Sequence, residues 1–183
     1  VKIVEALCHD NVVNLDAVNG NGNTALYRVT VLGQSVTLKS KVSSEQLLQM
    51  ATALLDGGAD LNKKGANDFT PLTWAAYTGN IELVTLLTTR GADGDVQDMN
   101  GWTPLMHAVS RGHSEVVHIL IENHVNVDIR WKDGSSALLM AIQAGKTEIA
   151  TMLIDAGADL SIATTSEGRN AVLYCTLFSR DAI

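Results

Sequence analysis

A step of 33 residues recurs along this chain and limits its fold more than any other feature. The triplets Thr70-Pro71-Leu72, Thr103-Pro104-Leu105 and Ser136-Ala137-Leu138 are spaced 103 − 70 = 33 and 136 − 103 = 33 residues apart. Two other series keep the same step: Gly79, Gly112 and Gly145, and then Gly58, Gly91, His124 and Gly157. Three independent landmarks in one register indicate an internal repeat.

Each repeat carries the signals of two short helices. The hydroxyls of Thr70, Thr103 and Ser136 are suited to cap a first helix, with Pro71 and Pro104 at the first helical position. Gly79, Gly112 and Gly145 suit its left-handed end. A second helix is predicted from Ser114 to about Glu122, because its apolar residues recur at helical spacing. His124 replaces the glycine that ends this helix elsewhere, so mild backbone strain is expected there.

Helices of roughly eight or nine residues are too short to be stable alone in water. A single unit cannot bury its own apolar face, whereas stacked units can, and each then contacts only its neighbours. The Asp-, Asn- and Gly-rich stretch 93–101 suits a turn or hairpin. We therefore predict an all-α solenoid of stacked helix-turn-helix units with hairpin-like links.

The central unit resembles an ankyrin repeat through the letters GWTPLMHA, GHSEVVHILI and VNVD between residues 101 and 128. Gly91-Ala92-Asp93 and Gly157-Ala158-Asp159 match the Gly-Ala-Asp ending of that family. The resemblance covers nearly the whole chain. Thr73, Met106 and Leu139 depart from it, since the family often has His there, and Ser136-Ala137 replaces Thr-Pro. The resemblance implies an ankyrin-repeat solenoid.

We predict a single array over residues 1–183. It consists of a partial repeat (1–18), a repeat with an insertion at about 34–46 (19–64), regular repeats (65–97, 98–130 and 131–163) and a partial repeat (164–183). Both ends interrupt a repeat, and natural arrays need polar capping repeats, so we expect a fragment of a longer ankyrin-repeat protein.

The insertion is evident from the spacing of equivalent threonines: Thr24 and Thr70 are 70 − 24 = 46 residues apart in sequence rather than 33. It ends at Ser43-Ser44-Glu45-Gln46, the pattern of a capping box that opens a helix. Two interpretations stay open. It is either a neutral surface loop or a basic finger, with Lys39 and Lys41, that extends a binding surface.

Composition excludes some function classes. The formal net charge of −7 argues against nucleic-acid binding, which requires a basic face. No run approaches 18 apolar residues, so no membrane span is predicted. Cys8 and Cys175 are expected at opposite ends of the stack, beyond disulfide reach. Free thiols fit a cytoplasmic location, with the nucleus or a host cytosol left open, and we expect the chain to be a monomer.

The resemblance also implies a binding surface, because partners of ankyrin proteins usually meet the hairpin tips and the exposed side of the first helices. The corresponding positions are Asn67, Phe69, Tyr77, Thr78, Met99, Asn100, Trp102, Ser110, Arg111, Lys132, Asp133, Ser135 and Gln143. Phe69 and Trp102 each precede a capping Thr, so we expect them to line up as exposed aromatic anchors. The alternative is that they only cover the neighbouring hairpin. Trp131 and Arg130 lie on the adjacent link, and Trp74 is expected in the core.

Signals of catalysis or metal binding are weak. Gly145-Lys146-Thr147 resembles the end of a phosphate-binding loop, but Met140 stands where that loop needs glycine. No histidine pair has the spacing of a zinc site, and His107 is expected to be packed or partly exposed. No nucleophile is placed on a strained turn. We predict no enzyme activity, no cofactor and no metal.

One hairpin residue suggests a modification. Asn62 follows Gly58-Ala59-Asp60-Leu61, with Leu54 eight residues upstream (62 − 54 = 8). This resembles the asparagine that an oxygen-dependent hydroxylase modifies in many ankyrin proteins. The alternative is an asparagine that makes local hydrogen bonds.

Taken as a functional unit, the chain is predicted to be a non-catalytic module that binds a partner protein or peptide through its concave face and hairpin tips. Its mechanism is a rigid scaffold that loses little entropy on binding. The alternative is a regulatory or targeting domain of a longer enzyme, channel or pathogen effector, whose activity lies elsewhere.

Overall fold

The computed structural model describes residues 13–32 and 43–161. In these ranges the chain forms eight α-helices and one 3-10 turn, with no strand. The helices come in consecutive pairs: α2 (Ala25–Leu32) and α3 (Ser44–Asp56), α4 (Pro71–Thr78) and α5 (Ile81–Thr89), α6 (Pro104–Arg111) and α7 (Ser114–Glu122), α8 (Ala137–Gln143) and α9 (Thr147–Asp155).

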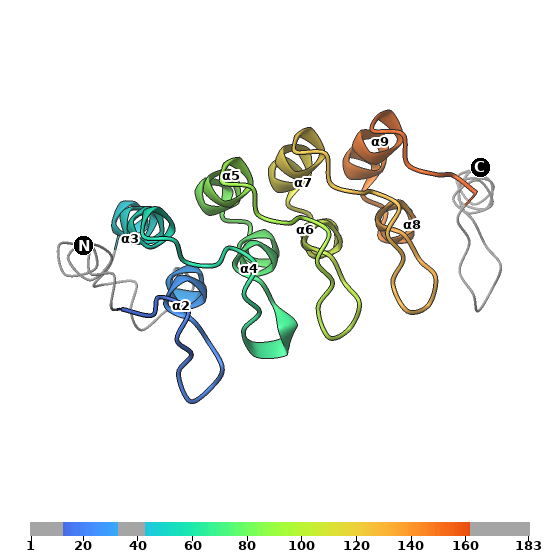
Figure 1. Cartoon of the computed structure of the whole chain (residues 1–183). Coiled ribbons are helices and arrows are strands. Elements are labelled where there is room, and N and C mark those ends of the chain that lie inside the picture. Colours follow the sequence, from blue (N-terminus) through green and yellow to red (C-terminus); the bar gives the residue numbers. More distant parts are fainter. Residues whose placement is uncertain (1–12, 33–42, 162–183) are drawn as a thin grey trace.

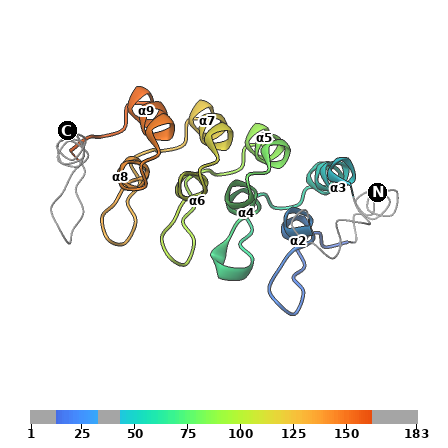
Figure 2. The same cartoon turned by 180° about the vertical axis from the view of Figure 1, so that it is seen from behind.

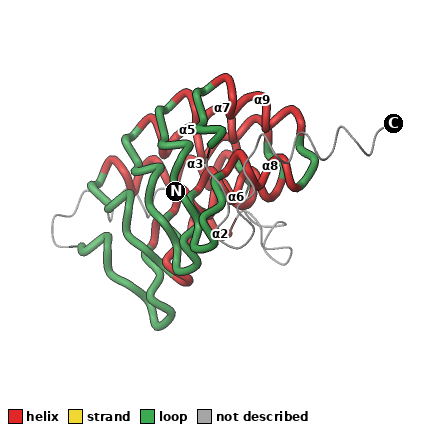
Figure 3. The backbone as a smooth tube through the Cα atoms, turned by 90° about the vertical axis from the view of Figure 1, so that its right-hand side faces the viewer, coloured by secondary structure: helices red, strands yellow, loops and turns green. Residues whose placement is uncertain are grey.

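The pairs stack side by side in sequence order (Figure 1). The first helices α2, α4, α6 and α8 form one row and the second helices α3, α5, α7 and α9 the other, as the reverse view in Figure 2 also shows. The long links that carry the hairpins lie together on one side of the helices (Figure 3). The predicted all-helical solenoid is confirmed.

Several predictions fall outside the described residues. These are most of the first partial repeat, the last partial repeat, residues 34–42 of the insertion with Lys39 and Lys41, and the cysteines Cys8 and Cys175.

The predicted helix caps are confirmed. The side-chain oxygens of Thr70, Thr103 and Ser136 accept the amides of Thr73, Met106 and Leu139 at 3.1, 3.3 and 3.4 Å. Ser43 and Gln46 form both hydrogen bonds of a capping box, at 3.2 and 2.9 Å. Gly79, Gly112 and Gly145 have φ angles of +72°, +79° and +66°. His124 has φ +59°, so the strain expected at that position is present.

The hairpins before the first helices share one closure. The amides of Asn19, Gly65, Asp98 and Trp131 donate to the carbonyls four residues on, at 2.8–3.0 Å. Gly22, Gly101 and Gly134 take the positive φ that each tip requires. In the remaining hairpin Asp68 holds that place with φ +60°, beside Asn67 at the same φ. There the 3-10 turn η1 (Ala66–Asp68) forms, since Asn and Asp tolerate the left-handed region better than most residues.

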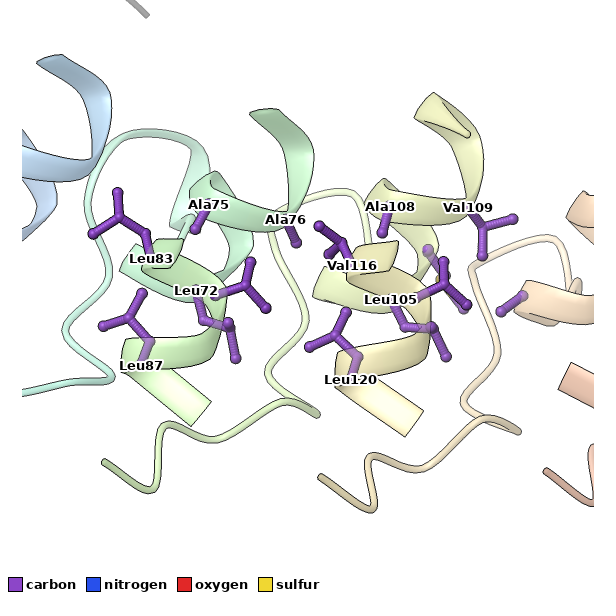
Figure 4. Packing of buried hydrophobic residues seen from close by; sticks show 14 of the residues in the cluster. Leu72, Ala75, Ala76, Leu83, Leu87, Leu105, Ala108, Val109, Val116 and Leu120 are labelled. Carbon is purple, nitrogen blue, oxygen red and sulfur yellow. The ribbon is translucent and has the colours of Figure 1, made fainter. Parts of the chain in front are cut away.

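The core runs through the stack because the same position of each repeat supplies the same kind of side chain. One series, Leu26, Leu72, Leu105 and Leu138, comes from the first helices. Another, Leu54, Leu87, Leu120 and Leu153, comes from the second helices. Figure 4 shows Leu72 and Leu87 repeating the arrangement of Leu105 and Leu120 one unit along. Each repeat therefore seals the apolar face of the next.

A continuous run of hydrogen bonds, here called the Asx ladder, ties the links together. Within a link, an Asp or Asn side chain accepts the amide two residues on, as Asp93 does from Asp95 at 2.9 Å. The second residue then accepts an amide from the following repeat. These bonds between repeats join Asp16 to Asp60, Asn62 to Asp93, Asp95 to Asn126, and Asp128 to Asp159, at 2.8–2.9 Å. Many of the acidic residues therefore have a structural use.

Candidate functional site

A groove of about 800 Å³ opens beside the first helices and their hairpins. Tyr77 of α4 lies in one wall, and α6 supplies His107, Ser110 and Arg111. Two neighbouring hairpins, seen side by side in Figure 1, supply the rest: Asn100, Trp102, Trp131, Lys132 and Asp133. The groove thus spans three successive repeats, and only stacking creates it.

Aromatic rings form a connected row along this side of the protein. All six aromatic side chains of the described residues take part, together with the His107 imidazole: Tyr27, Trp74, Phe69, Tyr77, Trp102 and Trp131. Their centroids lie 4.9–6.3 Å from those of their neighbours. This is the spacing of favourable edge and tilted contacts, so the row is a rigid platform.

Arg111 reaches back from α6 to α4. Its guanidinium carbon lies 4.0 Å from the centroid of the Tyr77 ring, and Nη2 donates a hydrogen bond to the Tyr77 hydroxyl. The cation–π contact and the hydrogen bond hold an otherwise mobile side chain in one place. The groove therefore presents a fixed positive charge over an aromatic face.

Asp98 and His107 lock the hairpin of the central repeat to α6. Both residues are buried, and Asp98 Oδ2 lies 2.9 Å from His107 Nε2. Asp98 Oδ1 accepts the amides of Asn100 and Trp102 at 2.8 and 2.9 Å. Burial lowers the pKa of His107 below its ordinary value, against the raising effects of the hydrogen bond and the charge of Asp98. The imidazole is therefore a neutral structural partner at pH 7.

The next hairpin closes the other side of the groove. Lys132 Nζ donates to the Met99 carbonyl at 2.7 Å, which joins the tips of adjacent hairpins. The Trp131 ring meets Trp102 edge-on, with centroids 5.6 Å apart. Two half-buried indoles thus line the groove together with Arg111 and Lys132.

The structure brings together seven of the thirteen residues predicted to form the binding surface. Tyr77, Asn100, Trp102, Ser110, Arg111, Lys132 and Asp133 line the groove. Asn67, Phe69 and Met99 do not line it. Met99 is nonetheless 55% exposed at a hairpin tip, and its amide donates to the Asn67 carbonyl at 3.2 Å.

The remaining candidates are scattered. Thr78 is half-buried, and its hydroxyl donates to the Trp74 carbonyl at 3.0 Å. Ser135 is buried, whereas Gln143 is exposed on α8. Arg130 is exposed, and its carbonyl accepts from Gln97 Nε2 at 3.1 Å. None of these four lines the groove.

Two expectations about aromatic residues are wrong. Phe69 is not an exposed anchor, because it is only 7% exposed and its ring packs against Trp74, Tyr77 and His107. Trp74 is not fully in the core but half-buried, and no hydrogen-bond acceptor is present for its buried Nε1 in the described structure. Phe69 and Trp102 do line up along the stack, since both rings contact His107.

Of the lining residues, His107 was not predicted from the sequence, and Trp131 was named only on the link next to the predicted surface. His107 lies three and four residues before Ser110 and Arg111, and helical spacing could have placed it on their face. Trp131 occupies the position that Asp98 holds one repeat earlier (131 − 98 = 33). The equivalent positions in the two preceding repeats hold Gly65 and Asp98, so the large aromatic side chain of Trp131 differs from both.

Asn62 belongs to the Asx ladder. It is exposed, and its backbone amide donates to Asp60 Oδ1 at 2.8 Å. Its side-chain Oδ1 accepts the backbone amide of Asp93 at 2.9 Å. The alternative reading of a hydrogen-bonding hairpin asparagine describes these contacts.

No group of three or more His, Cys, Asp or Glu residues in ranges 13–32 and 43–161 is placed to hold a metal ion. In the same ranges, no helix has the length and apolar character to cross a membrane.

Comparisons with known proteins agree with this architecture. A family model of ankyrin repeats (3 copies) matches residues 38–131, and one of ankyrin repeats (many copies) matches residues 111–154. The crystal structure of the ankyrin repeat protein EF0377 has a TM-score of 0.81 and 25% identity, covering 98% of this chain and 87% of that chain. A search of curated proteins gave no match.

Ankyrin repeats generally mediate protein–protein interaction and are typically non-catalytic. The first family match spans 131 − 38 + 1 = 94 of the 183 residues, which is more than half. The chain belongs to the ankyrin repeat family.

Proposed function

We propose that the chain is a non-catalytic binding module that holds a segment of a partner protein or peptide in the groove between its hairpin tips and the concave face of its first helices. The observation that carries this proposal is the concentration of half-buried Trp102 and Trp131 with Arg111 around one groove. Trp, Tyr and Arg are the residues that most often dominate binding energies at protein interfaces.

Binding in the groove requires little further ordering of its side chains. Arg111 is fixed on Tyr77, Lys132 is fixed on the Met99 carbonyl, and the hairpin that carries Trp102 is fixed through Asp98. Immobilising a rotamer-rich side chain on binding costs about 0.5–1.5 kcal/mol. Because these side chains are already held by the fold, much of that cost is met before a partner arrives.

The size of the groove defines what it can enclose. Its volume of about 800 Å³ lies within the roughly 300–1,000 Å³ of sites that enclose drug-sized ligands. A few consecutive side chains of a partner fill such a space. The exposed hairpin tips, including Asn67 and Met99, extend the contact beyond the groove.

Affinity capture from a lysate of the source cells tests the proposal. The bait is the whole chain, compared with Trp102→Ala in the groove and with His118→Ala, an exposed change on the second helix α7. Phe69 is left intact because it is buried. Circular dichroism melts confirm that each bait is folded. A partner kept by wild type and His118→Ala and lost by Trp102→Ala supports the groove. A partner kept by Trp102→Ala and lost by His118→Ala contradicts it.

A further inference from the structure

The charges around the groove point to the chemistry of its occupant. Arg111 and Lys132 line the groove, and Lys146 lies beside it with Nζ donating to the Ser110 carbonyl at 3.2 Å. None of the three forms an ion pair with a carboxylate in the described part of the chain. Elsewhere, Lys64 and Arg90 do have carboxylate partners. Within residues 13–32 and 43–161, the groove therefore holds cations that no carboxylate neutralises by direct contact.

Two carboxylates, Asp98 and Asp133, belong to the hairpins beside the groove, and both accept hydrogen bonds from backbone amides. Asp98 is buried and accepts from two backbone amides and lies beside His107. Asp133 lines the groove, and its Oδ1 accepts the Ser135 amide at 2.7 Å. None of the acidic residues of the Asx ladder lines the groove. Among the charged lining residues, Arg111 and Lys132 outnumber Asp133, and Lys146 adds a further positive charge beside them, so the site is locally positive although the net charge of the chain is −7.

The positive charges beside the groove also act on a neighbouring histidine. His113, which follows α6, has its pKa lowered first by burial and then by the positive charges of Arg111 and Lys146. Its Nε2 lies 3.3 Å from the Tyr77 carbonyl, so it packs against the same repeat junction.

Arg111 is poised for a carboxylate. One of its five N–H groups is used on Tyr77, and the ring below keeps the guanidinium plane fixed. An arginine held in this way presents an edge that matches the two oxygens of a carboxylate. The indoles of Trp102 and Trp131 offer apolar surface in the same groove.

We propose that the groove binds an acidic peptide segment, whose carboxylate pairs with Arg111 and Lys132 while an adjacent aromatic or branched apolar side chain packs on Trp102 and Trp131. This inference rests on the proposed function and names its partner class. The carboxylate comes from an Asp or Glu side chain or from a free C-terminus, and both sources share the same recognition.

Selection from a random peptide library displayed with free C-termini, using the whole chain as the target, tests this inference. We expect enrichment of peptides with a carboxylate close to an aromatic or branched apolar residue. Synthetic copies, with free and with amidated C-termini, distinguish a terminal from a side-chain carboxylate. Affinity measured by fluorescence polarisation should fall as salt increases, because exposed charge pairs are screened.

Variants locate the interaction. Arg111→Gln should weaken binding by about 10-fold, equivalent to about 1.4 kcal/mol. Arg90→Gln, the same loss of charge at a site outside the groove, should leave the affinity unchanged. Arg111→Glu should weaken the acidic peptide further, and a peptide with Lys in place of its carboxylate residue should bind that variant better than it binds wild type.

Other outcomes overturn one or both proposals. Neutral or basic peptides that lose affinity with Trp102→Ala, yet are unaffected by Arg111→Gln, would overturn the acidic preference and leave the groove as the binding site. Peptides unaffected by both changes would overturn the groove as well. A library from which no peptide is enriched counts against both.

Discussion

Replacing Leu120 by alanine should remove a large part of the stability of the array. The side chain is 0% exposed and belongs to the second helix of the central unit. Helix α7 packs on α5, α6 and α9, so a cavity at this place affects three repeats together. Figure 4 shows Leu120 beside Leu105 and Val116, with the apolar side chains of the preceding repeat next to them.

The magnitude follows from burial. The substitution removes three carbon groups, which at about 0.8 kcal/mol each lose about 2.4 kcal/mol of transfer free energy. The cavity that remains adds to this loss, because close-packed neighbours relax only in part. The expected total is therefore about 3–5 kcal/mol. This is a large share of the roughly 5–15 kcal/mol by which a typical domain is stable.

Equilibrium urea denaturation followed by circular dichroism measures the loss, with the slope checked for two-state behaviour. The matched control is Ile119→Ala, a similar truncation at a half-buried position of the same helix, which should cost less. A loss below about 1 kcal/mol for Leu120→Ala, or equal losses for the two variants, would refute the packing argument.

Three further predictions concern a cap, the histidines and the Asx ladder. Gly91→Ala should lower the free energy of unfolding by about 1–2 kcal/mol, because alanine is strained in the left-handed conformation of this residue. Gly79→Ala should lower it more, because the new Cβ would lie 2.7 Å from the His113 ring, whereas nothing lies within 4 Å of a Cβ at Gly91. Equal costs in urea melts would count against this contact. Stability should be full above pH 6.5 and fall as the pH drops below it, because burial lowers the folded pKa of His107 and His113 and the unfolded chain then takes up protons first. If stability falls equally at low pH in a variant with both histidines replaced by Gln, the histidines are not the cause. Asn62→Ala should cost about 1 kcal/mol by removing a hydrogen bond between repeats, and Asn62→Asp, which keeps the acceptor, should cost less in the same melts.

The sequence by itself determined the helices and their stacking. Thr103 caps the helix that begins at Pro104, and Gly112 ends it in a left-handed conformation, as their spacing predicts. Such signals depend on contacts between residues three or four apart, so no tertiary knowledge is needed to read them. The step of 33 residues then dictates that equivalent leucines meet in one core.

Only the tertiary structure decided which surface residues share a site. Phe69 and Trp102 occupy equivalent positions, yet Phe69 is covered by Trp74, Tyr77 and His107 while Trp102 lines the groove beside Trp131. Periodicity places two side chains on the same face, but their burial depends on the size of the side chains around them, in the same repeat and in the adjacent one. The groove likewise exists because residues of three repeats converge. Arg111 and Lys132 come from different repeats, and both line the groove only because those repeats stack.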